Sequence, residues 1–126
     1  MKFYIGEDLT SSSITSDKIT GNIRSNVFET VRSIDILSFL EKFSEAKVLF
    51  LKMDVEGAEY PIVARMLATG AFCSGAQSKY VAIEYHAKKK ASPKEYRAVE
   101  QHFPEVIETI LKHQCGVEFT HFNRNQ

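Results

Sequence analysis

The chain has 126 residues, the length of one domain, and 44% of them are hydrophobic, which is enough for a buried core. Its 16 basic and 16 acidic residues give a formal net charge of zero, which argues against general attraction to nucleic acid or to a membrane surface. No apolar run reaches the roughly 18 residues of a membrane span. The N-terminus has no signal-peptide pattern, so the sequence predicts a cytoplasmic protein.

The first quarter of the chain predicts little regular structure. Phe3-Tyr4-Ile5 is a short apolar run typical of a strand, and the residues after it are rich in serine and threonine, which favours turns. We expect residues 1–26 to be an irregular lead-in to an α/β core over residues 27–126, the two forming one partial domain. Val27–Ile34 is rich in β-branched residues and predicts a second strand.

A helix is expected next. Ser33 is predicted to cap it, Asp35 places negative charge in its first turn, and apolar residues recur at helical spacing as far as Phe43. The two cysteines, Cys73 and Cys115, lie far apart and match no metal-binding spacing, so we expect reduced thiols.

The central feature is Val48–Met53, an apolar run broken only by Lys52. This density predicts a strand buried on both faces, as in a parallel sheet. Lys52 either pairs with a carboxylate or is solvated at the end of the sheet. An acidic turn follows at once, in which Gly57 is expected to allow either a positive φ or a close approach of the backbone.

The later elements alternate helix and strand. A helix from Tyr60 carries Pro61 in its first turn and stops at Gly70. The strand Lys79–His86 then completes a parallel βαβ unit. Further on, the sequence predicts a capping box, two helices and a closing edge strand that runs antiparallel, in the order Ser92–Glu95, Tyr96–Phe103, Val106–Leu111 with a stop at Gly116, and Val117–Phe122.

Lys52–Tyr60 reads K-M-D-V-E-G-A-E-Y, which resembles the K-[IM]-D-[IV]-E-G-[AH]-E signature of FkbM-type S-adenosylmethionine-dependent methyltransferases. Val31–Asp35 resembles the V-x-[ST]-[IL]-D segment that precedes that signature. The resemblance implies an α/β, partial doubly wound, Rossmann-like sheet. It also implies S-adenosylmethionine as cofactor and methyl transfer to the hydroxyl of a small molecule or sugar.

The cofactor-binding half of the family pattern is missing. In the family, a glycine-rich turn resembling D-x-G-A-N-x-G and a later acidic residue hold the cofactor. Here the six glycines are scattered, with no two within four residues of each other. The chain thus resembles the C-terminal portion of the domain, and we assign no cofactor-binding residues. We expect one of three things: a fragment of a full enzyme, a partner of a chain that carries the N-terminal half, or a non-catalytic remnant. Alone, the chain is expected to be inactive.

Four titratable residues are the candidate catalytic groups. Asp54 and Glu56 follow the central strand, and Glu84 and His86 end its predicted neighbour. Because ligands bind at the carboxyl ends of parallel strands, we expect one site there. Asp54 can act as a general base or ligate a divalent cation; the alternative is that it forms the turn and caps the next helix. The alternative for Glu56 and Glu59 is acidic charge placed at the N-terminus of that helix. These side chains offer metal ligands, but no short metal-binding motif is present, so no metal is predicted.

A second class of function stays open. Without the missing strands, an uncovered sheet edge would favour a binding or assembly module that associates with itself.

Overall fold

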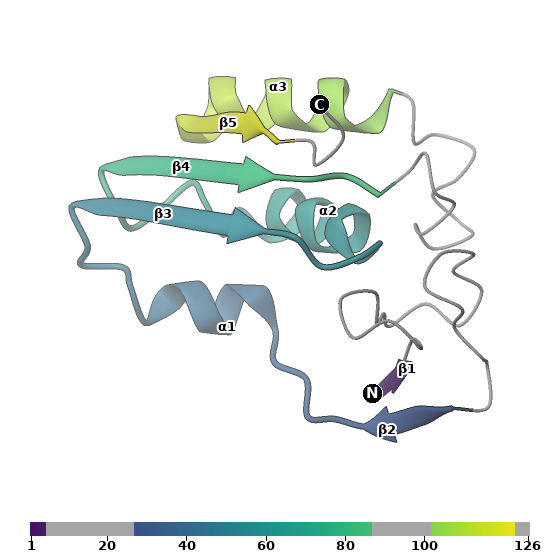
Figure 1. The fold of residues 1–126 in the computed structure, drawn as a ribbon. Coiled ribbons are helices and arrows are strands. Elements are labelled where there is room, and N and C mark those ends of the chain that lie inside the picture. The colour runs from purple at the N-terminus through teal and green to yellow at the C-terminus, as the bar shows by residue number, and fades with distance from the viewer. Residues whose placement is uncertain (5–26, 87–101, 123–126) are drawn as a thin grey trace.

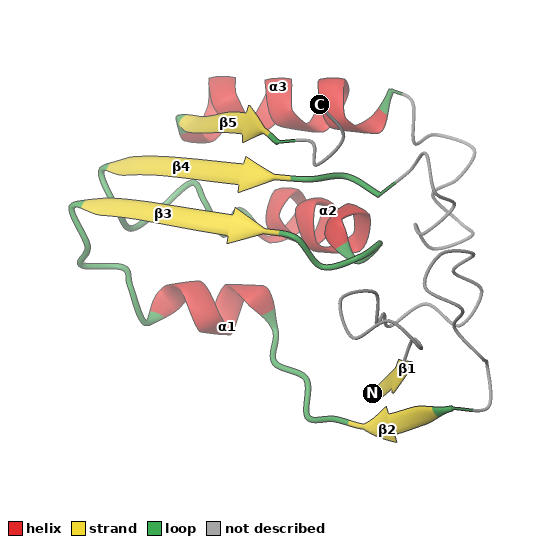
Figure 2. Ribbon diagram, in the orientation of Figure 1, coloured by secondary structure: helices red, strands yellow, loops and turns green. Residues whose placement is uncertain are grey.

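The computed structural model describes residues 1–4, 27–86 and 102–122, and the fold is given from these residues (Figure 1). Three parallel strands form the main sheet in the order β3-β4-β5, while β1 and β2 pair antiparallel as a separate ribbon (Figure 2). The elements are, in chain order, β1 (Lys2–Tyr4), β2 (Phe28–Thr30), α1 (Ile36–Glu41), β3 (Val48–Met53), α2 (Glu59–Thr69), β4 (Ser78–Ile83), α3 (Phe103–Cys115) and β5 (Val117–His121). This mixed α/β arrangement is compatible with part of a Rossmann-like fold.

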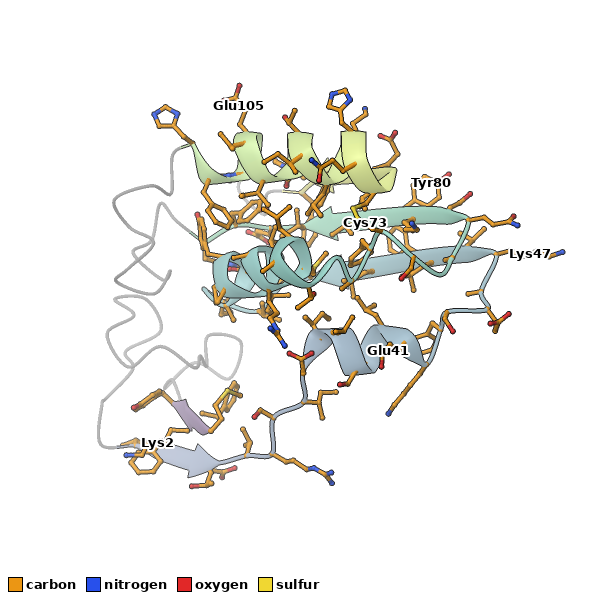
Figure 3. The ribbon with its side chains drawn as sticks, turned by 180° about the vertical axis from the view of Figure 1, so that it is seen from behind. Lys2, Glu41, Lys47, Cys73, Tyr80 and Glu105 are labelled. Atoms are coloured by element: carbon orange, nitrogen blue, oxygen red, sulfur yellow. A yellow bond between two sulfur atoms is a disulfide. The ribbon has the colours of Figure 1, made fainter. Side chains whose placement is uncertain are left out.

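The central strand β3 has the predicted bounds, but only one of its faces is buried. Met53 is buried, whereas Val48 and Phe50 are 60% and 65% exposed. The prediction of burial on both faces is therefore wrong. Helices α2 and α3 lie on the same side of the sheet, as the front and rear views show (Figures 1 and 3). Apolar density alone does not reveal whether a second helical layer is present.

The βαβ unit is confirmed. β3 and β4 pair in parallel with Val48 beside Ser78, and α2 connects them. Pro61 lies in the first turn of α2, and Gly70 ends the helix in the left-handed conformation with φ 64°. Together with α3, these elements enclose a hydrophobic core whose fully buried members are Val63, Met66, Phe72, Val81, Ile83, Leu111 and Val117.

The closing strand runs parallel, so the antiparallel prediction is wrong. β5 pairs with β4 in parallel, with Lys79 beside Val117. The reason is that α3 carries the chain back along the sheet before β5 begins, as α2 does before β4 (Figure 1). Gly116 ends α3 with φ 68°, as predicted. The predicted capping box at Ser92–Glu95 and most of the helix after it fall outside the described residues.

Helix α1 is capped by Asp35 rather than by Ser33. Asp35 Oδ1 accepts a hydrogen bond from the Leu37 N–H at 3.0 Å, and its Oδ2 accepts one from Arg65 Nε at 2.9 Å. The helix ends at Glu41, before the predicted Phe43. In the lead-in, β1 confirms part of the first predicted strand, and β2 lies within the second; residues 5–26 are not described.

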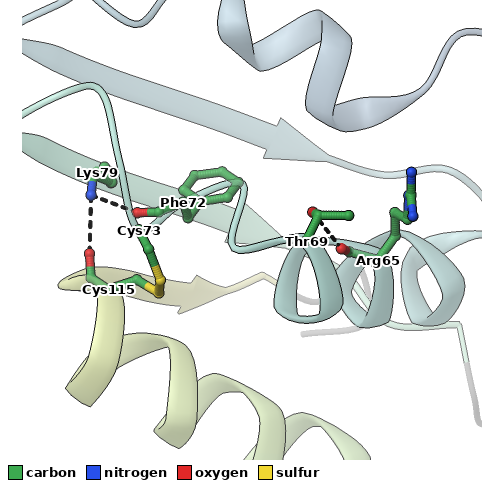
Figure 4. The surroundings of a disulfide bond; sticks show 6 residues. All are labelled: Arg65, Thr69, Phe72, Cys73, Lys79 and Cys115. Carbon is green, nitrogen blue, oxygen red and sulfur yellow. Dashed lines mark hydrogen bonds between the residues drawn. A yellow bond between two sulfur atoms is a disulfide. The ribbon is translucent and has the colours of Figure 1, made fainter.

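The two cysteines are joined, which corrects the prediction of reduced thiols. A disulfide links Cys73, after α2, to Cys115, the last residue of α3 (Figure 4). The buried Lys79 donates to the Phe72 carbonyl at 2.5 Å and to the Cys115 carbonyl at 3.1 Å. The same two segments are thus held together by a covalent bond and by a lysine ammonium.

Within the described ranges, no helix has the length and apolar character needed to cross a membrane.

Candidate functional site

The candidate site lies where β3 and β4 end. Met53 and Ile83 are partners in the sheet, and the Glu84 N–H still donates to the Met53 carbonyl at 3.1 Å, so the two strands finish level with each other. Asp54 and Glu56 leave the end of β3, and His86 lies three residues beyond β4. The topology therefore brings residues about thirty positions apart to one edge of the sheet.

Glu59, the first residue of α2, ties these two strand ends together. Its side chain is fully buried, with Oε1 accepting from the Val55 N–H and Oε2 from the Gly57 N–H, both at 3.0 Å. Oε1 also lies 2.7 Å from His86 Nδ1. An ionised carboxylate only accepts hydrogen bonds, so we assign the donated proton to Nδ1 of His86. The other ring nitrogen, Nε2, is thereby fixed in orientation.

Nε2 of His86 faces the two carboxylates of the acidic turn. It lies 3.7 Å from Asp54 Oδ1 and 3.6 Å from Glu56 Oε1. Each of the three residues offers one atom that could bind a metal ion, and these three atoms all lie within 4.8 Å of one another. The histidine side chain is 5% exposed, while Asp54 and Glu56 are 14% and 18% exposed, so solvent reaches the group from the carboxylate side. We call Asp54, Glu56 and His86 the carboxylate–histidine cluster.

The charges around the ring alter the acidity of His86. Burial lowers the pKa of the imidazole, but the hydrogen bond to Glu59 and the negative charges of Glu59, Glu56 and Glu84 outweigh it, so the pKa is raised above its usual value. The surroundings of the ring therefore favour positive charge at this point.

The turn that carries Asp54 and Glu56 is not extended. Gly57 has φ 106°, which confirms the predicted positive φ, and Glu56 itself has φ 51°. A left-handed conformation is uncommon for a residue with a side chain, and it tends to occur at sites where a specific geometry is needed. The chain reverses at Glu56, and this reversal brings the Glu56 carboxylate to the same nitrogen that Asp54 approaches.

Two further predicted residues have different places. Glu84 is buried beside the cluster and acts on His86 through its charge, but it is not one of the three converging groups. Lys52 satisfies both alternatives, since its side chain is 61% exposed and its Nζ lies 4.0 Å from Asp54 Oδ2.

Sequence reasoning missed the role of Glu59 and a second polar group next to the site. Tyr85 donates from its hydroxyl to Glu108 Oε1 at 3.0 Å, and His121 Nε2 lies 2.8 Å from Glu108 Oε2. Burial and the neighbouring Glu108 carboxylate raise the pKa of the Tyr85 hydroxyl well above its usual range. The signal for Glu59 was its position: a carboxylate at the start of a helix can reach back to the free N–H groups before it.

The sequence profile described as "Methyltransferase FkbM domain" matches residues 3–119, which include every residue of the carboxylate–histidine cluster. Searches of curated proteins and of solved structures find no significant match. The profile match spans nearly the whole chain, and the chain therefore belongs to the FkbM methyltransferase domain family.

Proposed function

We propose that this chain supplies the acceptor side of a methyltransferase that uses S-adenosylmethionine to methylate a hydroxyl oxygen of a small molecule or sugar. Membership of the FkbM family supports the methyl-transfer reaction. The observation that carries the acceptor side is the convergence of Asp54, Glu56 and Nε2 of His86 at the carboxyl edge of the parallel sheet.

Methylation of a hydroxyl forms a bond between the methyl carbon and the oxygen, and the hydroxyl proton must leave. The cluster offers acceptors for that proton, namely the carboxylates of Asp54 and Glu56 and the Nε2 atom of His86. The other ring nitrogen, Nδ1, is already hydrogen-bonded to Glu59. Asp54 and Glu56 form the solvent-accessible side of the cluster, so an acceptor molecule would meet them first. His86 stands behind them and is held in place by Glu59.

S-adenosylmethionine would supply the methyl group as an electrophile. The described residues do not fit as its cradle: the turn after β3 holds two carboxylates, with a third at the start of α2, and no glycine-rich strand-to-helix turn occurs in the ranges the structure describes. We therefore assign no residue of this chain to the cofactor. We propose that these residues form the C-terminal portion of the catalytic domain. The cofactor side would then be supplied by other residues of the same polypeptide or by another chain.

The test is a methyl-transfer assay on the polypeptide at its natural length, with radiolabelled S-adenosylmethionine and a panel of hydroxylated acceptors. We expect label in an ether linkage. We also expect Asp54→Asn and Glu56→Gln to lower kcat/KM by about 100-fold or more, the usual contribution of a positioned acid or base. Glu118→Gln is the matched control, because Glu118 is a carboxylate on β5 whose side chain is 56% exposed. Wild-type rates in both cluster variants, or label found only on nitrogen or carbon, would contradict the proposal.

An assembly module is the second candidate, and one observation favours it. Phe50 and Tyr80 are neighbours in the sheet register and are 65% and 44% exposed, next to the exposed Val48. A contiguous apolar surface of this kind is typical of contact sites between proteins.

If the chain acts as an assembly module, sedimentation velocity will show self-association that increases with protein concentration and that Phe50→Ser abolishes. A wild-type chain that stays monomeric at all concentrations tested excludes self-association through this face.

A further inference from the structure

We infer that Asp54, Glu56 and Nε2 of His86 bind a divalent transition-metal ion. The inference deepens the proposed function and rests on it in one respect: the cation would hold oxygen atoms of the acceptor molecule. Binding of the cation itself depends only on the geometry of the carboxylate–histidine cluster.

The distances suit a shared ion better than direct hydrogen bonds. Nε2 lies 3.7 Å from Asp54 Oδ1 and 3.6 Å from Glu56 Oε1, whereas hydrogen bonds to nitrogen span about 2.7–3.2 Å. Two ligands bound at about 2.1 Å in a tetrahedral arrangement are about 3.4 Å apart. The two distances from Nε2 are close to this value, and the three ligand atoms all lie within 4.8 Å of one another, so rotation of the two carboxylates would let the three side chains bind one ion.

The charges of the cluster also call for a cation. With the proton of the neutral ring on Nδ1, toward Glu59, the lone pair of Nε2 points at two carboxylates. Positive charge between these three groups would relieve their mutual repulsion, and two carboxylates neutralise one divalent ion. The competing account places a proton on Nε2 instead, which makes His86 an imidazolium paired with Asp54 and Glu56.

The surroundings of His86 match those of a metal-binding histidine. Metal-bound histidines usually donate their other ring N–H to a carboxylate or a carbonyl, which fixes the ring and its tautomer. Glu59 provides that carboxylate at 2.7 Å and is itself held by two backbone N–H groups. The left-handed conformation of Glu56 adds a second specific feature, because it directs that carboxylate back toward the ring.

The ligand set indicates which ions would bind. One imidazole and two carboxylates are typical of Zn²⁺ and Mn²⁺, whereas Mg²⁺ prefers oxygen ligands and keeps several waters. Three protein ligands leave at least one coordination position open, as in catalytic rather than structural sites. Since Asp54 and Glu56 are partly exposed, that position is accessible to water or to an acceptor oxygen.

The test is a titration of the metal-free polypeptide, at its natural length, with MnCl₂ and with ZnCl₂, followed by calorimetry and by the electron paramagnetic resonance of free Mn²⁺. We expect one ion per chain. Asp54→Asn, Glu56→Gln and His86→Asn should each weaken binding by about 10-fold or more. Glu59→Gln, which removes the carboxylate that positions His86, should lower the metal affinity by about 10- to 100-fold, the usual effect of removing such a partner.

His121→Asn is the matched control, since it removes a histidine–glutamate pair outside the cluster. Circular dichroism checks that each variant is folded. If Glu59→Gln does not fold, the nearly isosteric Asp54→Asn decides the outcome. Absence of stoichiometric binding, or binding that survives all the cluster substitutions, overturns the inference.

Nitrogen-15 NMR separates the ion from a proton. Zn²⁺ should shift the Nε2 resonance of His86 at constant pH and leave Nδ1 protonated. A spectrum of an imidazolium that does not respond to the metal would support the competing account and overturn the inference. If the titrations detect no metal binding and methyl transfer continues in the presence of a chelator, the cation site is contradicted and the proposed function stands. Metal binding without any methyl transfer contradicts the proposed function alone.

Discussion

Glu59 is the residue on which the geometry of the site depends. At the sequence level it reads as negative charge near a helix N-terminus, which would leave it exposed. In the structure it is fully buried and satisfies two backbone N–H groups of the acidic turn and one ring nitrogen. A buried carboxylate with three donors fixes the turn, the helix start and His86 relative to one another.

Replacing Glu59 by glutamine is expected to lower the free energy of unfolding by about 1–3 kcal/mol. Glutamine keeps the shape, but its NH₂ group faces a backbone N–H that then has no acceptor. Glu105→Gln is the matched control, because Glu105 is also an acid in the first turn of a helix, α3, and is exposed. Urea denaturation measures both variants. Equal losses in the two would show that Glu59 acts only through the helix dipole.

At the scale of elements, Asp35 connects α1 to α2. It caps α1 and pairs with Arg65 of α2 at 2.9 Å. The hydrogen bond and charge of Arg65 hold the pKa of the Asp35 carboxyl below its usual value. A carboxyl whose pKa is lowered by folding stabilises the protein above the pKa of the unfolded chain, and the contribution is lost as pH falls through the folded value.

Asp35→Asn keeps a capping side chain and removes the charge. At neutral pH we expect a modest fall in Tm, because the pair is partly exposed and screened by solvent. The difference from wild type should shrink as the pH is lowered past the usual range for aspartate. Arg65→Gln should behave in the same way, and the double variant should add nothing more. A difference in Tm that is constant between neutral and acidic pH would show that the ion pair does not contribute.

The sequence predicts some elements better than others for physical reasons. Three predictions follow from residues close together in sequence, and the structure confirms them: the strand Val48–Met53, the start of α2 near Pro61 and its end at Gly70. The direction of β5 is not local: the alternation in Val117–His121 is the same in either direction, and the connection through α3 decides it. The cap of α1 was misplaced by two residues because Ser33 and Asp35 are both good capping residues.

At the scale of the whole molecule, the parallel order of the strands accounts for the site. Because carboxyl ends of neighbouring parallel strands meet, Asp54, Glu56 and His86 could be expected near one edge, and the structure brings them there. The inward turn of Glu59, the reversal at Glu56 and the pairing of Cys73 with Cys115 could not be predicted. The position of Glu59 depends on contacts with His86 on another strand end, and the disulfide joins two residues 42 positions apart in sequence. The φ of Glu56 is one that a residue with a side chain seldom adopts, so no sequence rule predicts it.

The most direct test of the central claim is the methyl-transfer rate of His86→Asn compared with that of His121→Asn. Both changes remove an imidazole that pairs with a glutamate, but only His86 belongs to the cluster at the end of β3 and β4. We predict that kcat/KM falls by about 100-fold or more for His86→Asn and stays near wild type for His121→Asn. Equal rates for the two folded variants would contradict the assignment of the carboxylate–histidine cluster to the reaction.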